Sequence, residues 1–380
     1  MKHITFLTTA RSDFGLIKNL ILEINKIKNF KVSLIATGSH FSKEYGNTFK
    51  EILENKIKIS KKIKIIKNNT LTDLSKPITD CIIKSSKFFK KNKIDLLIIL
   101  GDRFEAFAIA LSAHINQIPI GHIHGGEVTM NVMDDAFRHS ITKLSQLHFT
   151  ANKIYQNRVI QLGENPKNVF LVGGLGIDAI NRTKFLTTKQ LEQKFKINLN
   201  KGKNIIVTVH PETLEKKFDI KNIKALINAI EYFKGKINFI FTSPGNELKS
   251  NIIKKEILKY VKKRSNCYYF NSLGSQNYYS LLKYADAMLG NSSSGILEMP
   301  YFNKPTINIG NRQTGRLMDK TIINVSWGKK EIINGIKKSL AKQFKGQKLF
   351  GNGGSTNKIV KILLNMTLGN LIIKKFYDLK

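Results

Sequence analysis

The sequence predicts an α/β protein built on two parallel sheets. Short apolar, strand-like runs alternate with helix-like segments along most of the 380 residues, which is the pattern of a doubly wound parallel sheet. The chain is also long for a single domain. A stretch rich in glycine and polar residues, 173–185, interrupts the alternation, which then restarts. We therefore expect two Rossmann-like domains of similar size, 1–178 and 179–365, followed by a C-terminal segment, 366–380.

The first half contains six apolar runs that we interpret as strands, at 3–9, 31–37, 94–100, 118–124, 147–150 and 169–172. The segments between them have helical character, at 15–27, 42–54, 72–91, 103–115, 133–146 and 152–162. Because strand-like and helical segments alternate almost throughout, successive strands should be joined by helical crossovers and run parallel.

The second half repeats this order. We predict strands at 204–210, 237–243, 267–270, 286–290 and 305–310. The predicted helices lie near 219–233, 248–263 and 278–284, from 294 onward, and in two closing segments at 327–344 and 357–376. Pockets favour the interface between two such domains, so we expect the functional site in the interdomain cleft.

Composition limits the possible functions. The formal charge is +36, from 63 basic and 27 acidic residues. Such a charge is typical of nucleic-acid or membrane-surface binding, but only 8 of the basic residues are arginine and the lysines are scattered. A lysine-rich proteome explains this pattern better, so we predict neither a nucleic-acid partner nor a membrane partner.

Cys81 and Cys267 lie far apart in apolar surroundings, which argues against a disulfide framework or a thiolate metal site. No apolar run approaches the roughly 20 residues needed to span a bilayer. We expect a cytoplasmic protein.

Charged side chains gather in the stretch 101–140, just after two of the predicted strands. They are Asp102, Arg103, Glu105, His122, His124, Glu127, Asp134, Asp135, Arg138 and His139. Ligands of open parallel sheets bind beyond the carboxyl ends of the strands, so this stretch is predicted to form part of a site. The histidines and aspartates could hold a metal, but no third ligand has compelling spacing and arginines bring positive charge. Acid–base chemistry fits these residue types better, and we predict no metal.

A second candidate region, GNSSSGILEMP at 290–300, follows a short strand and opens a helix. Ser292 and Ser293 can bind a phosphate with hydroxyl and N–H groups, and Glu298 can bind ribose hydroxyls. The alternative is an ordinary capped turn, because serine is a common N-cap. The stretch is neither a Walker A loop nor GxGxxG, so it indicates neither ATP hydrolysis nor NAD binding.

Three further strand ends carry polar candidates. Arg312 follows the strand at 305–310 and can grip a phosphate bidentately. Arg11 and Ser12 stand at the corresponding turn of the first domain. His210 ends another strand, where it can bind a phosphate, transfer protons or serve a structural role.

Together these stretches resemble one family, the hydrolysing UDP-N-acetylglucosamine 2-epimerases, in particular the bacterial sialic-acid and legionaminic-acid pathway branch. The motifs that carry the resemblance occur in family order over nearly the whole chain: RSDFG, GSH at 38–40, GDRFEA, HIHGGE, DDAFRHSITKLS, HPET, GNSSSGILE and GNRQTGR. The resemblance implies a GT-B arrangement of two Rossmann-like domains, with a C-terminal helix at 366–380 crossing back to the first domain. It also implies a homodimer or homotetramer and no cofactor.

The resemblance further implies a reaction and residue roles. A base removes the C2 proton of a UDP-linked 2-acetamido sugar while the C1–O bond breaks, and water then adds to a 2-acetamidoglucal intermediate to give N-acetylmannosamine and UDP. The residues matching catalytic or active-site positions are Asp102, Asp134 and His210, with His124 assisting where other branches carry Glu. Those matching site-lining or nucleotide-binding positions are Arg11, Ser12, His40, Arg103, Glu127, Arg138, Ser292, Ser293, Glu298 and Arg312.

Two alternatives share much of this pattern. A sibling group acts on the nucleotide-linked 2,4-diacetamido-2,4,6-trideoxy sugar of legionaminic acid synthesis, with UDP or GDP. A GT-B glycosyltransferase, from another class, would need an acceptor site and would not release free sugar.

Overall fold

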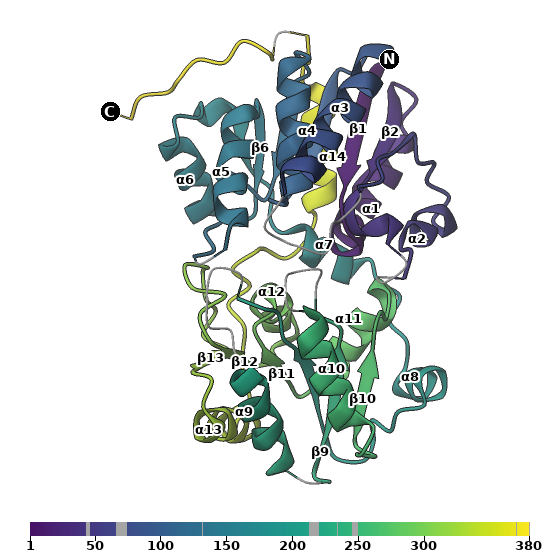
Figure 1. The fold of residues 1–380 in the computed structure, drawn as a ribbon. Helices are drawn as coiled ribbons and strands as arrows, with labels where there is room; N and C mark the ends of the chain where they lie inside the picture. The colour runs from purple at the N-terminus through teal and green to yellow at the C-terminus, as the bar shows by residue number, and fades with distance from the viewer. Residues whose placement is uncertain are drawn as a thin grey trace. The chain divides into compact units, whose positions relative to one another are not determined.

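The computed structural model describes residues 1–42, 46–65, 74–130, 132–212, 220–233, 235–244, 250–369 and 371–379 (Figure 1). The chain divides into two compact units. The first comprises Met1–Val128, Asp134–Asn181 and Phe350–Lys380, and the second comprises Thr129–Met133 and Arg182–Leu349.

The first unit is built on a seven-stranded sheet in the order β3-β2-β1-β4-β5-β6-β7, and every neighbouring pair is parallel. Its strands are β1 (Lys2–Thr8), β2 (Phe30–Ala36), β3 (Lys61–Lys62), β4 (Leu96–Leu100), β5 (Ile120–Ile123), β6 (Leu147–Thr150) and β7 (Val169–Leu171). The central strands are almost wholly buried, as expected when helices cover both faces of a parallel sheet.

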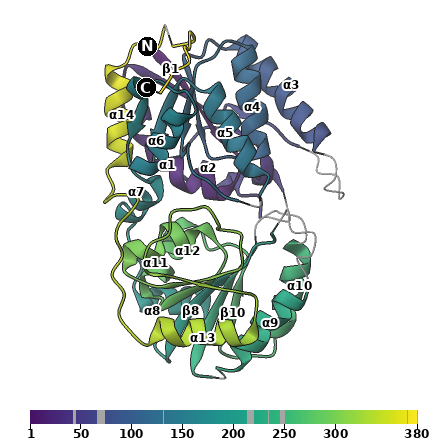
Figure 2. The same ribbon diagram turned by 90° about the vertical axis from the view of Figure 1, so that its left-hand side faces the viewer.

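Eight α-helices accompany this sheet in the described residues: α1 (Arg11–Asn25), α2 (Phe49–Glu54), α3 (Ser75–Lys91), α4 (Phe104–Ile115), α5 (Asp134–Leu144), α6 (Lys153–Gln161), α7 (Leu175–Asn181) and α14 (Ser355–Asn365). Helix α1 buries Phe14, Ile17, Leu20, Ile21 and Ile24, spaced by three or four residues on one face. The same core includes residues of α14, so the end of the chain packs beside its beginning (Figure 2).

The second unit has a six-stranded parallel sheet in the order β10-β9-β8-β11-β12-β13. Its strands are β8 (Lys203–Thr208), β9 (Ile237–Thr242), β10 (Cys267–Phe270), β11 (Ala287–Gly290), β12 (Thr306–Ile309) and β13 (Ile322–Val325). Its described α-helices are α8 (Thr188–Phe195), α9 (Ile220–Glu231), α10 (Ser250–Val261), α11 (Ser275–Tyr284), α12 (Ser293–Leu297) and α13 (Lys329–Leu340).

The strands predicted from apolar runs are present, but three expectations differ from the structure. The stretch 173–185, which was expected to interrupt the alternation, contains a helix, α7. The apolar side chains of this helix, Leu175, Ile177 and Ile180, are buried. The second unit ends at Leu349, not 365, since α14 packs on α1 in the first unit. The predicted helix at 366–380 is wrong: the last helix is α14, and the described residues beyond it contain neither helix nor strand.

Smaller elements were not predicted. Strand β3 (KK) contains no apolar residue, β13 (IINV) is only four residues long, and α8 (TKQLEQKF) buries only Leu191. Of the helix expected at 42–54, only Phe49–Glu54 is α-helical, and residues 43–45 lie outside the described part. None of the helices in the described ranges is both long and apolar enough to cross a membrane.

Candidate active site

The most densely charged part of the first unit lies where β4 ends. Gly101 has a positive φ of 83°, which turns the chain after the strand and places Asp102 before α4. The guanidinium of Arg138, from α5, donates hydrogen bonds to the carboxylate of Asp102, to Asp135 at 2.8 Å and to the carbonyl of Glu127 at 3.0 Å. The structure therefore brings together three of the predicted site residues.

The side chain of Arg138 is only 2% exposed. Burial is the largest single effect and disfavours its charged form, but the carboxylates of Asp102, Glu127 and Asp135 together outweigh it and raise the pKa of Arg138. Arg138 is therefore a permanent buried cation, with Asp102 as its counterion.

Arg103 organises a second group of charges at the start of α4. It donates to Glu105 at 3.2 and 3.3 Å. Burial lowers its pKa, but the carboxylates of Glu105, Asp13 and, more weakly, Asp134 reverse this and raise the pKa of Arg103. The predicted catalytic Asp134, in the first turn of α5, thus faces the field of a fixed arginine.

His124 stands in an unusual backbone conformation, with φ of 66°. The N–H of Leu175 donates to its Nε2 at 3.3 Å, so the ring proton is on Nδ1, which lies 3.6 Å from Oε1 of Glu127. A left-handed conformation at a non-glycine residue costs free energy and is enriched at functional sites. This geometry couples His124 to Glu127, and both were predicted site residues.

His40 is placed differently from the expectation of a site-lining residue. It is fully buried, with Nε2 2.9 Å from the hydroxyl of Thr8 and Nδ1 2.9 Å from that of Thr48. Burial lowers the pKa of His40 to about 4, so the ring is neutral at physiological pH. Two threonine partners favour a supporting role under the strand end, and a contact with a ligand stays a prediction.

Arg11 and Ser12 begin α1, after the end of β1. The hydroxyl of Ser12 donates to Asp13 at 3.1 Å. Burial raises the pKa of Asp13, and the nearby Arg103 opposes this rise. The turn therefore carries cations next to a helix start, a setting that suits an anion.

In the second unit, Asn291 joins the ends of three loops. Its side chain accepts from the backbone N–H of His210 at 2.7 Å and donates to the carbonyl of His210 at 2.9 Å. The carbonyl of Asn291 accepts from Arg312 at 3.2 Å and from the side chain of Gln313 at 2.8 Å. His210 and Arg312, predicted separately, therefore share one buried organising residue that the sequence analysis did not single out.

The signal for Asn291 was present in the sequence. It stands between Gly290 and the serines, directly after a buried strand. Gly290 has a φ of 132° and lies so close to the carbonyl of Thr208 that a side chain would clash there. This close approach of β11 to β8 brings the Asn291 amide to the backbone of His210.

The serine stretch forms a short helix, α12, with Ser292 as its N-cap, accepting from the N–H of Ser294 at 3.3 Å. The structure thus shows the capped turn that was one of the two interpretations, and a phosphate at Ser292 and Ser293 stays a prediction. Ser294 in turn accepts from the hydroxyl of Tyr278 at 2.7 Å and donates to Glu298.

Glu298 is the most perturbed carboxyl of the second unit in the described residues. Burial raises the pKa of Glu298 to about 7, although hydrogen bonds from Ser294 and Tyr279 oppose the rise. A carboxyl that titrates near neutrality can serve as hydrogen-bond donor or acceptor for a polyol such as ribose.

Over the described ranges, no group of three or more His, Cys, Asp or Glu side chains is arranged to hold a metal ion. What the first unit offers instead is carboxylates beside fixed arginines, and imidazoles whose ring nitrogens are held by hydrogen bonds or face a carboxylate. Such a set can accept and deliver protons and stabilise a developing negative charge.

Comparison with known proteins identifies the family. The model of the UDP-N-acetylglucosamine 2-epimerase family matches residues 22–364. The chain belongs to this family, as its motifs predicted.

Two relatives and one solved structure give the likeness more detail. The chain is 39% identical to the GDP/UDP-N,N'-diacetylbacillosamine 2-epimerase (hydrolyzing) of Campylobacter jejuni, over 100% of this chain and 99% of the relative. It is 36% identical to the polysialic acid biosynthesis protein P7 of Escherichia coli, over 90% of this chain and 88% of the relative.

The fold resembles that of the UDP-GlcNAc 2-epimerase from Neisseria meningitidis bound to UDP-GlcNAc. The TM-score is 0.82 at 21% sequence identity, over 96% of this chain and 100% of the other. This likeness confirms the predicted fold class, an α/β protein with two Rossmann-like domains of the GT-B type.

Proposed function

We propose that this protein is a hydrolysing nucleotide-sugar 2-epimerase that converts UDP-N-acetylglucosamine and water into N-acetylmannosamine and UDP. The observation that carries the proposal is the cluster in which buried Arg138 binds Asp102 where β4 ends. It supplies fixed charge and a carboxylate in a chain that belongs to the 2-epimerase family.

The reaction balances without a redox cofactor. A base takes the C2 proton while the C1–O bond to the diphosphate breaks, which leaves a 2-acetamidoglucal and the nucleoside diphosphate. Water then adds to C1 and a proton is delivered to the opposite face of C2, so the configuration at C2 is inverted.

In this proposal the first unit handles the protons. Asp102 and Asp134 are the acid–base candidates, because each carboxylate lies in the field of an arginine: buried Arg138 for Asp102 and the partly buried Arg103 for Asp134. The His124 and Glu127 pair assists, since its Nδ1 proton faces a carboxylate at 3.6 Å. Arg138 fixes the position of Asp102 and keeps its carboxylate paired with a buried cation.

The second unit binds the nucleotide. Breaking the C1–O bond places charge on the diphosphate, which needs cationic and N–H donors. Arg312, the serines Ser292 and Ser293 and the loop of His210 supply such donors, with Arg11 of the first unit as a further cation. Glu298 is the proposed partner of the ribose hydroxyls.

A second candidate substrate has its own support. The relative that is 39% identical over the full length carries diacetylbacillosamine in its name, and it is named with both GDP and UDP. The nucleotide-linked 2,4-diacetamido-2,4,6-trideoxy sugar would undergo the same elimination, because both substrates share the 2-acetamido group and the C1 diphosphate. A cytoplasmic location and a homo-oligomeric state stay predictions.

A substrate panel tests the proposal. The purified protein is incubated with UDP-N-acetylglucosamine and with the UDP and GDP forms of the diacetamido sugar, and nucleotide and sugar release are followed by NMR. We expect free nucleoside diphosphate and a C2-inverted sugar from one of the three. Transfer to an added acceptor without free sugar would replace the proposal with a GT-B glycosyltransferase.

A further inference from the structure

The C-terminal segment 371–379, here called the tail, ends the chain against α5 and the loop that follows α6. The backbone N–H of Tyr377 donates to the carbonyl of Gly163 at 2.9 Å, and the ring of Phe376 lies against Gly163. In Figure 1 the tail runs in yellow to the C label near α6. These contacts dock a segment that has no secondary structure of its own.

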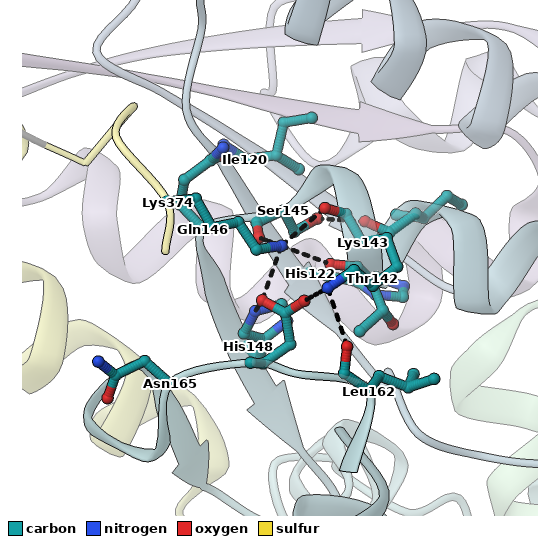
Figure 3. Close-up of polar contacts among 12 residues, drawn as sticks. Ile120, His122, Thr142, Lys143, Ser145, Gln146, His148, Leu162, Asn165 and Lys374 are labelled. Atoms are coloured by element: carbon teal, nitrogen blue, oxygen red, sulfur yellow. Dashed lines mark hydrogen bonds and ion pairs between the residues drawn. The ribbon is translucent and has the colours of Figure 1, made fainter. Parts of the chain in front are cut away.

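Lys374 is the polar centre of this docking (Figure 3). Its ammonium group donates to the carbonyls of Lys143 at 2.6 Å and Ser145 at 2.7 Å, with a longer contact to Thr142 at 3.5 Å. These carbonyls lie at the end of α5, where a helix leaves carbonyls without partners in the next turn. A cation there also complements the negative end of the helix dipole.

Glu164 is the counterion of Lys374. Its carboxylate is 2% exposed and lies 2.7 Å from Lys374, 2.8 Å from Lys143 and 3.0 Å from Nε2 of His148. Burial disfavours the charged form, but hydrogen bonds from these three partners outweigh it and lower the pKa of Glu164 to about 2. Removing Lys374 would leave this buried carboxylate with less compensation.

A chain of hydrogen bonds links this end of α5 to the catalytic cluster. Nε2 of His122 lies 2.9 Å from the carbonyl of Gly101, which can only accept, so Nε2 carries the proton. Nδ1 of His122 is therefore an acceptor, and it lies 3.1 Å from the hydroxyl of Thr142, whose proton it shares with the carbonyl of Arg138, also at 3.1 Å. Thr142 is one turn beyond Arg138 on α5, and Gly101 precedes Asp102.

Burial lowers the pKa of His122 to about 3, so this linkage keeps the same tautomer at physiological pH. The last turn of α5 and the end of β4 are thus tied to each other at two points: Thr142 through His122 to Gly101, and Arg138 to Asp102. The docked tail therefore fixes the C-terminal end of α5, the helix that carries both Thr142 and Arg138.

We propose that Lys374 and Glu164 are positioning residues: by docking the tail on the last turn of α5, they hold Arg138 and Asp134 in register with Asp102. The inference rests on the proposed epimerase function for its kinetic consequence and on the contacts above for its structural one. The tail belongs to the same unit as the acid–base cluster. It therefore acts on the chemical step and leaves nucleotide binding unchanged.

The decisive variant is Lys374→Met, which keeps most of the apolar stem and removes the charge. Its matched control is Lys375→Met, the next residue, which is exposed. We expect kcat to fall about tenfold to a hundredfold in Lys374→Met, because small misplacements of catalytic groups have effects of this size. The dissociation constant of UDP should stay at the wild-type value, Lys375→Met should match wild type, and Lys374→Arg should recover most of kcat.

A second variant covers the case in which Lys374→Met does not fold. Thr142→Val leaves the tail contacts in place but removes the hydroxyl that binds His122, and it should also lower kcat without weakening UDP binding. Wild-type kcat in either folded variant would overturn the proposal. So would an equal loss in Lys375→Met.

Hydrogen exchange separates this inference from the proposed function. The amides of 138–146 should exchange faster in Lys374→Met than in Lys375→Met, whether or not the protein turns over any substrate tested. Turnover by wild type with unchanged exchange and kcat in Lys374→Met would refute the positioning role alone. Absence of turnover in wild type with faster exchange in the variant would refute the function alone.

Discussion

The two units hold their polar residues in different ways. In the first, charges are held by opposite charges: Arg138 binds Asp102 and Asp135, and Arg103 binds Glu105. In the second, Asn291 holds the loops of His210 and Arg312 through neutral amide and carbonyl groups.

This difference matches a division of labour. Interlocked ion pairs fix the position and charge state of groups that must exchange protons with a substrate. Neutral hydrogen bonds from an amide shape the loops of His210 and Arg312 without adding charge. The comparison agrees with our proposal that the first unit handles the protons and the second binds the nucleotide.

The strongest test of this comparison is Asp102→Asn. We expect turnover to fall at least about a thousandfold, because the variant loses both an acid–base group and the counterion of a buried arginine. UDP binding, measured by calorimetry, should be unchanged. Asp80→Asn, at a surface ion pair, is the control. Turnover near the wild-type level would show that the charge cluster of the first unit does not perform the chemistry.

Glu164→Gln tests whether the first unit depends on interlocked charge for its stability. The folded-state pKa of Glu164, about 2, lies below its ordinary value of 4.5, so its contribution is fully present above pH 4.5 and is lost as the pH falls toward 2. We expect the variant to be less stable than wild type at pH 7 by about 3 kcal/mol. Urea unfolding at several pH values should show this difference shrinking between pH 5 and pH 3. A difference that does not depend on pH would mean that the carboxylate charge is not responsible.

Arg312→Ala tests the nucleotide side of the comparison. Losing one charge-assisted contact to a phosphate should weaken UDP binding by about ten- to a hundredfold. Arg264→Ala is a control within the same unit, since Arg264 pairs with Glu231 at the surface. Equal UDP affinity in both variants would remove Arg312 from the nucleotide site.

The smallest expected effect concerns Glu298. Because burial raises its pKa to about 7, Glu298, the proposed partner of the ribose hydroxyls, is mostly protonated at pH 6 and mostly ionised at pH 8. UDP binding to wild type should weaken up to about tenfold from pH 8 to pH 6. In Glu298→Gln the diphosphate and the other ionisable groups titrate as they do with wild type. The pH dependence of UDP binding should therefore be flatter in this variant. Parallel profiles would exclude Glu298 as the titrating group.

Much of this organisation could be predicted from the sequence because apolar runs and strand ends are local signals. Asp102, Arg103 and Asp134 follow predicted strands or begin predicted helices, and the structure places them in one charged region. Parallel strands align their carboxyl ends, so residues after neighbouring strands converge without further information.

Other features depend on contacts between distant parts of the chain. Asn291 was not singled out from the sequence, because its role requires the close approach of β11 to β8. The family resemblance implied a helix at 366–380, yet the tail has no regular secondary structure and Lys374 binds carbonyls more than two hundred residues away. His40 resembled a site residue by motif, and only the structure shows both of its nitrogens held by threonines.

The central claim, that the first unit moves a proton at C2 while the nucleotide leaves, is tested most directly in D2O. Wild-type protein is incubated with UDP-N-acetylglucosamine, and with the diacetamido substrates if that sugar is not consumed, and the released sugar is analysed by NMR and mass spectrometry. The account predicts one deuterium at C2 of a C2-inverted free sugar. Free sugar that retains its original C2 hydrogen, or that retains the C2 configuration of the substrate, would contradict it.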